Sequence, residues 1–456
     1  MDLSSLRISK KENVNIVFVG HVDAGKSTIC GQILVLQGIV DKRTIDKYKV
    51  ASKESGRESW YLSWCLDTNP EEREKGKTTE VGSACFELKN RKINILDAPG
   101  HKQYVFEMIS GANSADIGVL VVSARISEFE AGFEKGGQTR EHILLMKSSP
   151  IQKLIVLVNK MDDPSVNWNE NRFLEIKKKI TNYVKNLFPL PDFIPISGIT
   201  GENLCNNGGI EYGGYLDEGS NGGSENGDDS KEHDNNLPNY NQNNSSSWYK
   251  GPSFFDLLDN IQLKPKDLLN LDITILENSK LTGSSYVYGL INCGVLKKDI
   301  TLKHIPSELL LNVNSILDLD DNDQEEFYPG DSVKIKFKNC DLDEVEIGHR
   351  LVNLDNNSFK SSNLFTCGLN ILDSNGLICV GFTCMLHLGI VKIQCKIKEL
   401  RKASEPNKKI RFVRTGDKAL ALIETENKVV LSEKKERFSI RIADKTLAVG
   451  VVRNVR

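Results

Sequence analysis

The segment of residues 20–27 constrains the fold of this chain more than any other part of the sequence. It has the form GxxxxGK[ST] and directly follows the aliphatic run of residues 14–19. Such a run predicts a buried strand, and the residues after the segment are compatible with a helix. A glycine-rich turn between a strand and a helix lets backbone amides and the helix N-terminus face a phosphate group. The residues predicted to surround the phosphates are Gly20, His21, Val22, Asp23, Ala24, Gly25, Lys26, Ser27 and Thr28.

Short aliphatic runs alternate with longer amphipathic stretches from residue 13 to about residue 197. This alternation is typical of a mostly parallel sheet flanked by helices. Beyond residue 264, β-rich runs separated by turn residues predict two antiparallel barrels rather than one large sheet. The strands expected in the first part are residues 14–19, 84–88, 93–96, 117–122, 154–158 and 193–196.

A second motif selects the base of the nucleotide. Residues 159–162 read Asn-Lys-Met-Asp and follow the aliphatic run 154–158. The Asp162 carboxylate can accept two hydrogens from guanine, whereas adenine would leave this charge without a donor. Lys160 could lay its stem across the base, and an amide of Ser197-Gly198 could face the guanine oxygen. With Asn159, these residues predict GTP and GDP as ligands.

Three side chains are predicted to hold Mg²⁺. Ser27 ends the phosphate-loop motif and offers a hydroxyl, and Asp97 follows the run 93–96 and would act through water. Thr78 is the expected second hydroxyl ligand, with Thr79 beside it as the alternative.

Hydrolysis is expected to depend on the residues after Asp97. Gly100 would let a backbone amide approach the γ-phosphate, and His101 would orient the attacking water as the catalytic residue. The alternative for His101 is an ordinary surface histidine. The motifs supply no arginine finger, so the sequence predicts weak intrinsic hydrolysis that a large partner stimulates.

The predicted fold class is a multidomain α/β plus all-β protein, in which a P-loop GTPase domain with a mostly parallel sheet precedes two antiparallel β-barrels. The expected boundaries are a short stub at 1–12, the GTP-binding domain at 13–262, and the barrels at 265–356 and 357–456. An insertion rich in Asn, Gly and Ser at about 205–247 cannot bury enough surface to offset its ordering entropy, so we expect it to be disordered.

Composition narrows the class of protein further. The 59 basic and 62 acidic residues nearly cancel, which argues against a protein that coats nucleic acid without discrimination. The ten cysteines form no CxxC pair and suggest reduced thiols. No apolar stretch approaches the roughly 20 residues that span a bilayer. We therefore expect a soluble, cytoplasmic protein that contacts no membrane.

Two motifs resemble those of the translational GTPase superfamily. They are GHVDAGKST at residues 20–28 and DAPGH at residues 97–101. The resemblance extends over nearly the whole chain, and it implies a G domain followed by two β-barrels.

The branch of the superfamily is indicated by segments outside these motifs. Residues 57–69, 75–82, 132–142 and 161–168 are similar to the eukaryotic class II peptide-chain release factors, more than to elongation factor 1-alpha. This similarity implies a GTPase of translation termination that binds the class I release factor and the ribosome, without stable direct reading of mRNA. Ribosome rescue, aminoacyl-tRNA delivery by the same architecture, and a nucleotide-gated scaffold with little hydrolysis are the alternatives.

The same similarity suggests where the class I factor docks. Arg437, Phe438 and Arg441 keep the pattern GRFxxRD in the last barrel, although Glu436 and Ile442 depart from it. A further departure is the pair at residues 106–107, where the family commonly has Pro-Asn.

Trp60, Tyr61 and Trp64 lie in a charged stretch. They could serve a partner or could pack locally, and the sequence leaves both open.

Overall fold

The computed structural model describes residues 11–54, 56, 58–66, 81–100, 104–134, 137–185, 187–205, 247–281, 284–319, 321–338, 344–372, 377–432, 436–443 and 445–455. Thr78, His101, the stub up to residue 10 and residues 206–246 of the predicted insertion lie outside these ranges.

The first domain is built on a six-stranded sheet with the order β2-β3-β1-β4-β5-β6. All neighbours are parallel except β2 and β3, and Ile16 of β1 lies between Ile95 of β3 and Ile117 of β4. Each strand overlaps one of the aliphatic runs, so the predicted strands are confirmed. The strands are β1 (Glu12–Gly20), β2 (Gly82–Glu87), β3 (Arg91–Asp97), β4 (Ile117–Ser123), β5 (Lys153–Asn159) and β6 (Asp192–Pro195).

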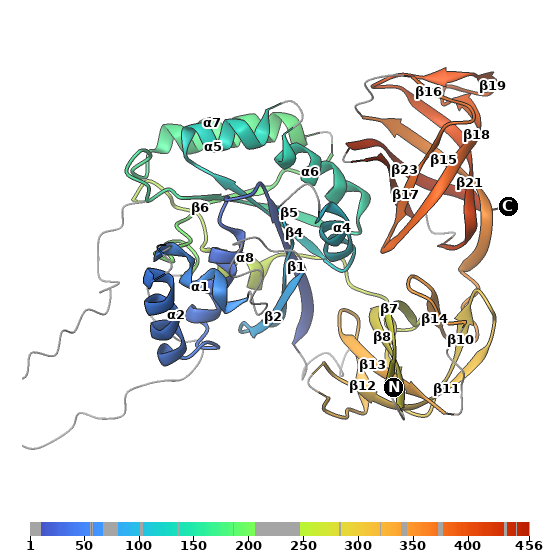
Figure 1. Ribbon diagram of the computed structural model, residues 1–456, viewed down its shortest axis with the longest axis horizontal. Coiled ribbons are helices and arrows are strands. Elements are labelled where there is room, and N and C mark those ends of the chain that lie inside the picture. Colours follow the sequence, from blue (N-terminus) through green and yellow to red (C-terminus); the bar gives the residue numbers. More distant parts are fainter. Residues whose placement is uncertain are drawn as a thin grey trace, which may run out of the picture.

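Helices cover both faces of this sheet (Figure 1). Val17 and Val19 of β1 belong to one buried apolar cluster, and Ile16 and Phe18 belong to the cluster on the opposite face. Since both faces are buried, the central strands are continuously apolar. One face carries α4 (Val105–Asn113), α5 (Ile126–Phe133), α6 (Gln138–Ser148) and α7 (Glu170–Val184), and the other carries α1 (Lys26–Leu36) and α8 (Phe254–Asn260).

Two closed barrels follow the α/β domain, which confirms the predicted fold class. The first barrel has the cyclic order β10-β11-β13-β8-β7-β14. Its strands are β7 (Asp272–Leu281), β8 (Ser284–Cys293), β10 (Thr301–Ile305), β11 (Leu310–Leu317), β13 (Ser332–Phe337) and β14 (Arg350–Val352), and β9 (Leu296–Lys297) pairs with β12 (Glu326–Phe327) beside it.

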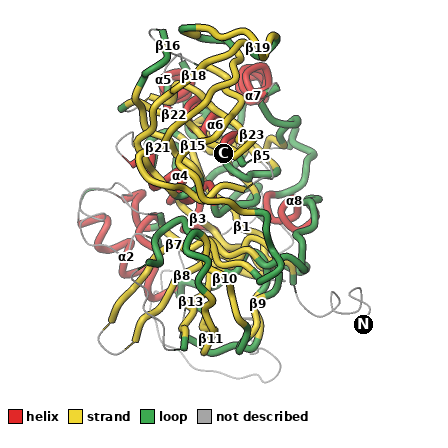
Figure 2. Tube along the Cα trace, turned by 90° about the vertical axis from the view of Figure 1, so that its right-hand side faces the viewer, coloured by secondary structure: helices red, strands yellow, loops and turns green. Residues whose placement is uncertain are grey.

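The second barrel closes where β17 pairs with β18. In Figure 2 its strands lie above those of the first barrel. Its elements are β15 (Phe359–Ile371), β17 (Thr383–Leu388), β18 (Val391–Lys402), β21 (Lys418–Ser432), β22 (Arg437–Ile442) and β23 (Lys445–Val455), with β19 (Glu405–Ile410) added to β18 and a small pair of β16 (Ile378–Cys379) and β20 (Phe412–Val413).

Polar contacts join the α/β domain to the first barrel. Lys266 in the connecting segment pairs with Asp116 at 2.8 Å, and the Asn15 amide donates to the Gly330 carbonyl at 3.1 Å. The Lys266 pair anchors the connecting segment to the α/β domain before the barrel begins, and the Asn15 bond holds the barrel itself against β1.

A second set of contacts joins the α/β domain to the second barrel. The Asn113 amide at the end of α4 donates to the Gly389 carbonyl at 2.6 Å. In α4, Phe106 makes an edge contact with His387, with ring centres 6.0 Å apart. The aromatic side chain at the departure from the family pattern therefore serves docking between domains.

The aromatic residues near position 60 take part in local packing. Trp64 is 7% exposed and meets Tyr48 of α2 (Lys42–Glu54) edge-on. A Cβ at Gly31 of α1 would lie 1.9 Å from the Leu62 carbonyl oxygen, so this glycine lets the segment approach the helix. Two short 3₁₀ helices, η2 (Glu58–Tyr61) and η3 (Ser63–Cys65), form this segment. For Trp64 the structure favours packing over a partner contact.

The nine cysteines among the described residues are free thiols. Within the described ranges, the helices are all too short or too polar to cross a lipid bilayer.

Candidate nucleotide-binding site

The loop after β1 is tightly held against the sheet. Gly20 is buried, and a Cβ there would lie 2.3 Å from the carbonyl oxygen of Val121 in β4. Gly25 has φ +91°, and its Cβ would lie 2.4 Å from the Asn159 amide nitrogen. Both positions therefore require glycine, one because of a close approach and the other also because of its left-handed backbone.

Lys26 fills the centre of this loop. Its side chain is buried, and Nζ donates to the carbonyls of Gly20 at 3.3 Å and His21 at 3.2 Å. Burial lowers the pKa of Lys26, while the nearby charge of Asp97 opposes this shift. A Cβ at Gly100 would lie 2.5 Å from Nζ, so Gly100, just after β3, comes close to the loop, as does Asp97 at the end of this strand. A buried cation at the centre of a glycine loop suits an anionic ligand.

Asn159 at the end of β5 joins two of the predicted loops. Its side chain is 3% exposed, its amide donates to the Ala24 carbonyl at 2.9 Å, and its oxygen accepts from the Gly198 amide at 2.8 Å. Ser197 is fully buried, and its hydroxyl accepts from the Thr200 amide at 3.1 Å. The structure thus brings the phosphate loop, the Asn-Lys-Met-Asp motif and the Ser-Gly pair to one edge of the sheet.

Lys160 is held by a charged network outside the motif. Its backbone has φ 62°, and its ammonium pairs with Glu128 of α5 at 2.8 Å. Arg125 bonds both Glu128, at 3.0 Å, and Asp163. Burial opposes ionisation of Glu128, yet hydrogen bonds from Lys160, Ser123 and Arg125 lower its pKa overall. Sequence reasoning missed Glu128 and Arg125, because no spacing in the motif signals a partner from the helix after β4.

His142 is a second residue that the motifs do not reveal. It lies in α6, is 1% exposed and is buried close to the Gly20 backbone. Burial, with the charges of Lys26, His21 and Arg441, lowers the pKa of His142 to about 3. The imidazole is therefore neutral at physiological pH and lies close to the phosphate loop.

The remaining predicted residues have simpler surroundings. His21, Val22, Gly25, Ser27, Thr28 and Asp162 are half-buried, Asp23 is exposed with φ 62°, and Ala24 is buried. Burial lowers the pKa of His21, partly offset by a hydrogen bond with Gln138. Thr78 and His101 lie outside the described residues, so their distances to the loop are not part of this geometry.

The three residues suggested for partner docking face inward or along the domain junction. Phe438 is 1% exposed and packs edge-on against Phe365 inside the second barrel. Arg441 is 3% exposed and bonds Glu141 of α6 at 2.8 Å. In this arrangement of the domains, Phe438 and Arg441 are buried, and docking of a partner by the three residues stays a prediction. Arg437 is exposed and donates to the Lys147 carbonyl at 3.4 Å.

The sequence model of the elongation factor Tu GTP binding domain matches residues 11–267, more than half of the chain. The chain belongs to this family. The elongation factor Tu C-terminal domain matches residues 358–456, the part that forms the second barrel. Membership of the family supports the expectation that the chain is a GTP hydrolase.

Curated relatives confirm the resemblance to the release factors. The "Eukaryotic peptide chain release factor GTP-binding subunit" of Candida maltosa is 36% identical over 97% of this chain and 59% of its own length. The protein of the same name from Schizosaccharomyces pombe is 38% identical over 97% of this chain and 64% of its own length. The chain therefore spans about three fifths of the length of these relatives.

A solved structure shares the whole fold. The GTPase-like domain of Ski7 from S. cerevisiae, bound to GTP, covers 99% of both chains with a TM-score of 0.74 at 19% identity. At this identity the likeness concerns the arrangement of the α/β domain and the two barrels.

Proposed function

We propose that the chain hydrolyses GTP and works in the cytoplasm as the GTPase of translation termination. Nucleotide binding is supported mainly by the Asn159 side chain. It hydrogen-bonds to the loop around Lys26 and to the loop at Gly198 at the same time. The termination part rests on the relatives at 36% and 38% identity, whose names describe the GTP-binding subunit of a release factor.

Each proposed site residue has a task on the nucleotide. The amides of residues 20–28 surround the phosphates, and the Lys26 ammonium moves from loop carbonyls to phosphate oxygens. Asp162 accepts the guanine donors, Lys160 covers the base, and the loop of Ser197 and Gly198 faces the guanine oxygen.

Mg²⁺ is the proposed metal, and the donors fit it. Ser27 at the start of α1 offers a hydroxyl, and the buried Asp97 at the end of β3 offers a carboxylate. Hard oxygen donors in small number suit Mg²⁺, which keeps waters and phosphate oxygens as its other ligands. When bound, the ion would neutralise charge on the phosphates, and Thr78 is the proposed further ligand.

In the proposed reaction, a water molecule attacks the γ-phosphorus, and the bond to the β–γ bridging oxygen breaks to give GDP and phosphate. His101 orients this water, and the Gly100 amide faces the γ-phosphate. Loss of the γ-phosphate would release the segments that follow Asp97 and thereby change affinity for partners.

The proposed partners are the class I release factor and the ribosome. Arg437 is the exposed member of the three residues first suggested for docking. Phe438 and Arg441 would contribute to a partner surface only by shaping the barrel or after the second barrel leaves α6.

Reconstituted termination on a ribosome stopped at a stop codon tests the proposal. We expect the chain with GTP and the class I factor to accelerate peptide release, and expect no acceleration with a non-hydrolysable GTP analogue. Acceleration with a stop-codon-blind relative of the class I factor would instead assign the chain to ribosome rescue. GTP-dependent binding of aminoacyl-tRNA would assign it to delivery.

His101→Ala tests hydrolysis itself. We expect ribosome-stimulated hydrolysis to fall by about 10²-fold or more, the range of a lost proton-handling group. His349→Gln in the first barrel is the matched histidine control and should leave the rate unchanged. An undiminished rate in His101→Ala would support a scaffold that binds GTP without useful hydrolysis.

A further inference from the structure

A cavity in the described part of the chain lies at the junction of the three domains, away from the nucleotide loops. It encloses about 1000 Å³ and is lined by the ends of α4 and α6, the segment 262–265 that leads to the first barrel, β7, β8 and β14, and the β17–β18 turn with β22. This volume is at the upper end of the range for small-molecule sites. A ligand here would touch all three domains at once.

Basic side chains outnumber acidic ones around this cavity. Its acidic residues are Asp272 and Glu436, and both are bound by Arg350, at 3.3 Å and 3.4 Å. In this triad Arg350 pairs with both carboxylates, and the two ion pairs hold the first barrel to the second. Four further cations line the cavity without a carboxylate within ion-pair distance among the described residues, and these are Lys147, Lys153, Lys264 and Arg437.

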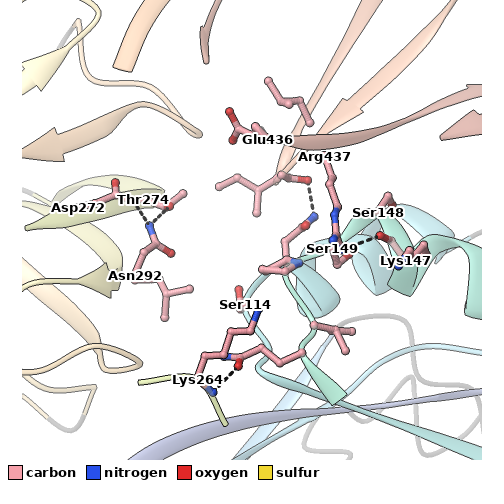
Figure 3. A pocket seen from close by; sticks show the side chains of 18 of the residues that line it. Ser114, Lys147, Ser148, Ser149, Lys264, Asp272, Thr274, Asn292, Glu436 and Arg437 are labelled. Carbon is pink, nitrogen blue, oxygen red and sulfur yellow. Dashed lines mark hydrogen bonds between the residues drawn. The ribbon is translucent and has the colours of Figure 1, made fainter. Parts of the chain in front are cut away.

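Two of these cations face each other across the domain boundary. Figure 3 shows Lys147 from α6 and Arg437 from β22 side by side, with Lys264 below and the polar wall of Asp272, Thr274 and Asn292 opposite. Burial lowers the pKa of Lys147, and the charge of Arg437 lowers it further. Like charges that meet in a partly buried site cost free energy, and a bound anion would remove that cost.

Ordinary structural roles account for only part of this arrangement. Lys147 is in the last turn of α6, where a cation is favourable, and its ammonium lies 5.2 Å from the centre of the Phe188 ring. Arg437 also serves this helix end, because it donates to the Lys147 carbonyl at 3.4 Å. Neither role applies to Lys153 or Lys264. With Lys147 and Arg437 they line one cavity, which calls for a further explanation.

We propose that the junction cavity binds a small polyphosphorylated molecule. An arginine gives bidentate contacts to one phosphate, and lysines act as point charges for others, so four cations match several phosphate groups better than one. The opposite wall is already organised, since the Asn292 amide donates to Asp272 at 3.1 Å and to Thr274 at 2.7 Å. Such a ligand would favour the arrangement in which the three domains close around it.

Calorimetry with inositol hexakisphosphate and inorganic tripolyphosphate tests this proposal. The full chain is first saturated with Mg²⁺ and GDP, so that the probes cannot occupy the nucleotide loop. We expect one probe to bind at a single site and Lys147→Gln combined with Lys264→Gln to weaken it by about tenfold or more. The matched control, Lys178→Gln with Lys428→Gln, removes two exposed lysines that lie outside the cavity and should bind like wild type.

Three results would overturn the proposal. They are the absence of probe binding to the wild-type chain, an equal loss in the junction variant and the control, and tighter binding of a short RNA at the same residues. Retention of fluorescent GDP by every variant shows that the α/β domain is folded. Since termination activity is not measured here, failure of this proposal leaves the proposed function untouched.

Discussion

Asn159 shows how one side chain can fix the geometry of a site. It satisfies a backbone acceptor at Ala24 and a backbone donor at Gly198, which are far apart in the sequence. Both groups are buried, so each would lose its partner if the amide were removed. The side chain therefore positions the loops for the phosphates and for the base relative to each other.

Asn159→Ala should weaken GDP binding strongly. An unsatisfied buried polar group costs about 1–3 kcal/mol, so affinity should fall by about 5- to 150-fold. Titration with fluorescent GDP measures this. Asn169→Ala is the matched control, because Asn169 caps α7 through the Arg172 amide and should cost helix stability without changing GDP affinity. Unchanged GDP affinity in a folded Asn159→Ala chain would contradict the view that Asn159 positions the two loops for the nucleotide.

Glu128→Gln should loosen Lys160 and speed GDP release modestly. The pair is partly exposed, with 21% of the lysine and 31% of the glutamate side chain accessible, so it contributes no more than about 1 kcal/mol. We expect GDP to dissociate about two- to fivefold faster in stopped-flow measurements. Glu175→Gln, which removes an exposed pair with Lys179 on α7, should leave the rate as in wild type. If GDP dissociated from Glu128→Gln at the wild-type rate, contact with the guanine base alone would be enough to hold Lys160.

At the scale of elements, apolar runs predicted the strands because each central strand is buried on both faces. Residues 154–158 lie inside β5 (Lys153–Asn159), and β13 (Ser332–Phe337) spans the residues of an alternating run. In β13, alternation places Val333 and Ile335 inside the barrel and leaves the lysines between them only half-buried. A local sequence pattern is enough to predict a strand where buried and exposed residues follow a fixed period.

Contacts between elements could not be predicted in the same way. Glu128 approaches Lys160 from helix α5, and Arg441 meets Glu141 although 300 residues of sequence separate them. No periodicity encodes such a pair, because it depends on how two finished elements dock. For the same reason the sequence did not indicate that the fold buries Phe438 and Arg441. The domain boundaries near residues 262–265 and 356–357 stay predictions.

Acid should destabilise the first barrel through His304. This side chain of β10 is fully buried between Ser307 and His349, and burial, together with the charge of His349, lowers its pKa to about 4. The unfolded chain, with a pKa near 6.5, binds a proton first as the pH falls. The stabilisation is therefore complete above about pH 6.5 and is lost towards pH 4, by about 2 kcal/mol between pH 7 and pH 5.

Hydrogen exchange of the β10 and β14 amides, corrected for intrinsic rates, measures this loss. Protection should fall by about 30-fold from pH 7 to pH 5 in wild type and much less in His304→Gln. His387→Gln in the second barrel is the control and should preserve the pH dependence of β10. Equal protection of wild type at both pH values would contradict the buried neutral state.

At the scale of the whole molecule, α6 links the second barrel to the phosphate loop. Its Glu141 accepts from Arg441 at 2.8 Å and from Thr446 at 3.1 Å, and the next residue, His142, is buried close to Gly20 and Lys26. Docking of the barrel and the shape of the loop thus depend on adjacent residues of one helix. A change in the docking of the second barrel should therefore alter the rate of GDP dissociation.

Arg441→Met should both release the barrel and speed GDP dissociation. Removing one partner of a buried pair costs about 3–5 kcal/mol, because the Glu141 charge stays behind with only Thr446. Small-angle scattering should show a larger radius of gyration, and stopped-flow should show faster GDP release. Adding Glu141→Gln removes the stranded charge and should restore part of both properties.

The matched control separates docking from the general loss of an arginine. Arg401 pairs with Glu399 within the second barrel, and its side chain is 38% exposed, so Arg401→Met should leave scattering and GDP release as in wild type. If Arg441→Met enlarged the molecule without changing GDP release, the barrel would dock independently of the loop, and His142 would act on Gly20 alone. If neither property changed, Phe106 and Asn113 would suffice to hold the barrel, and the buried pair would serve only to exclude other orientations.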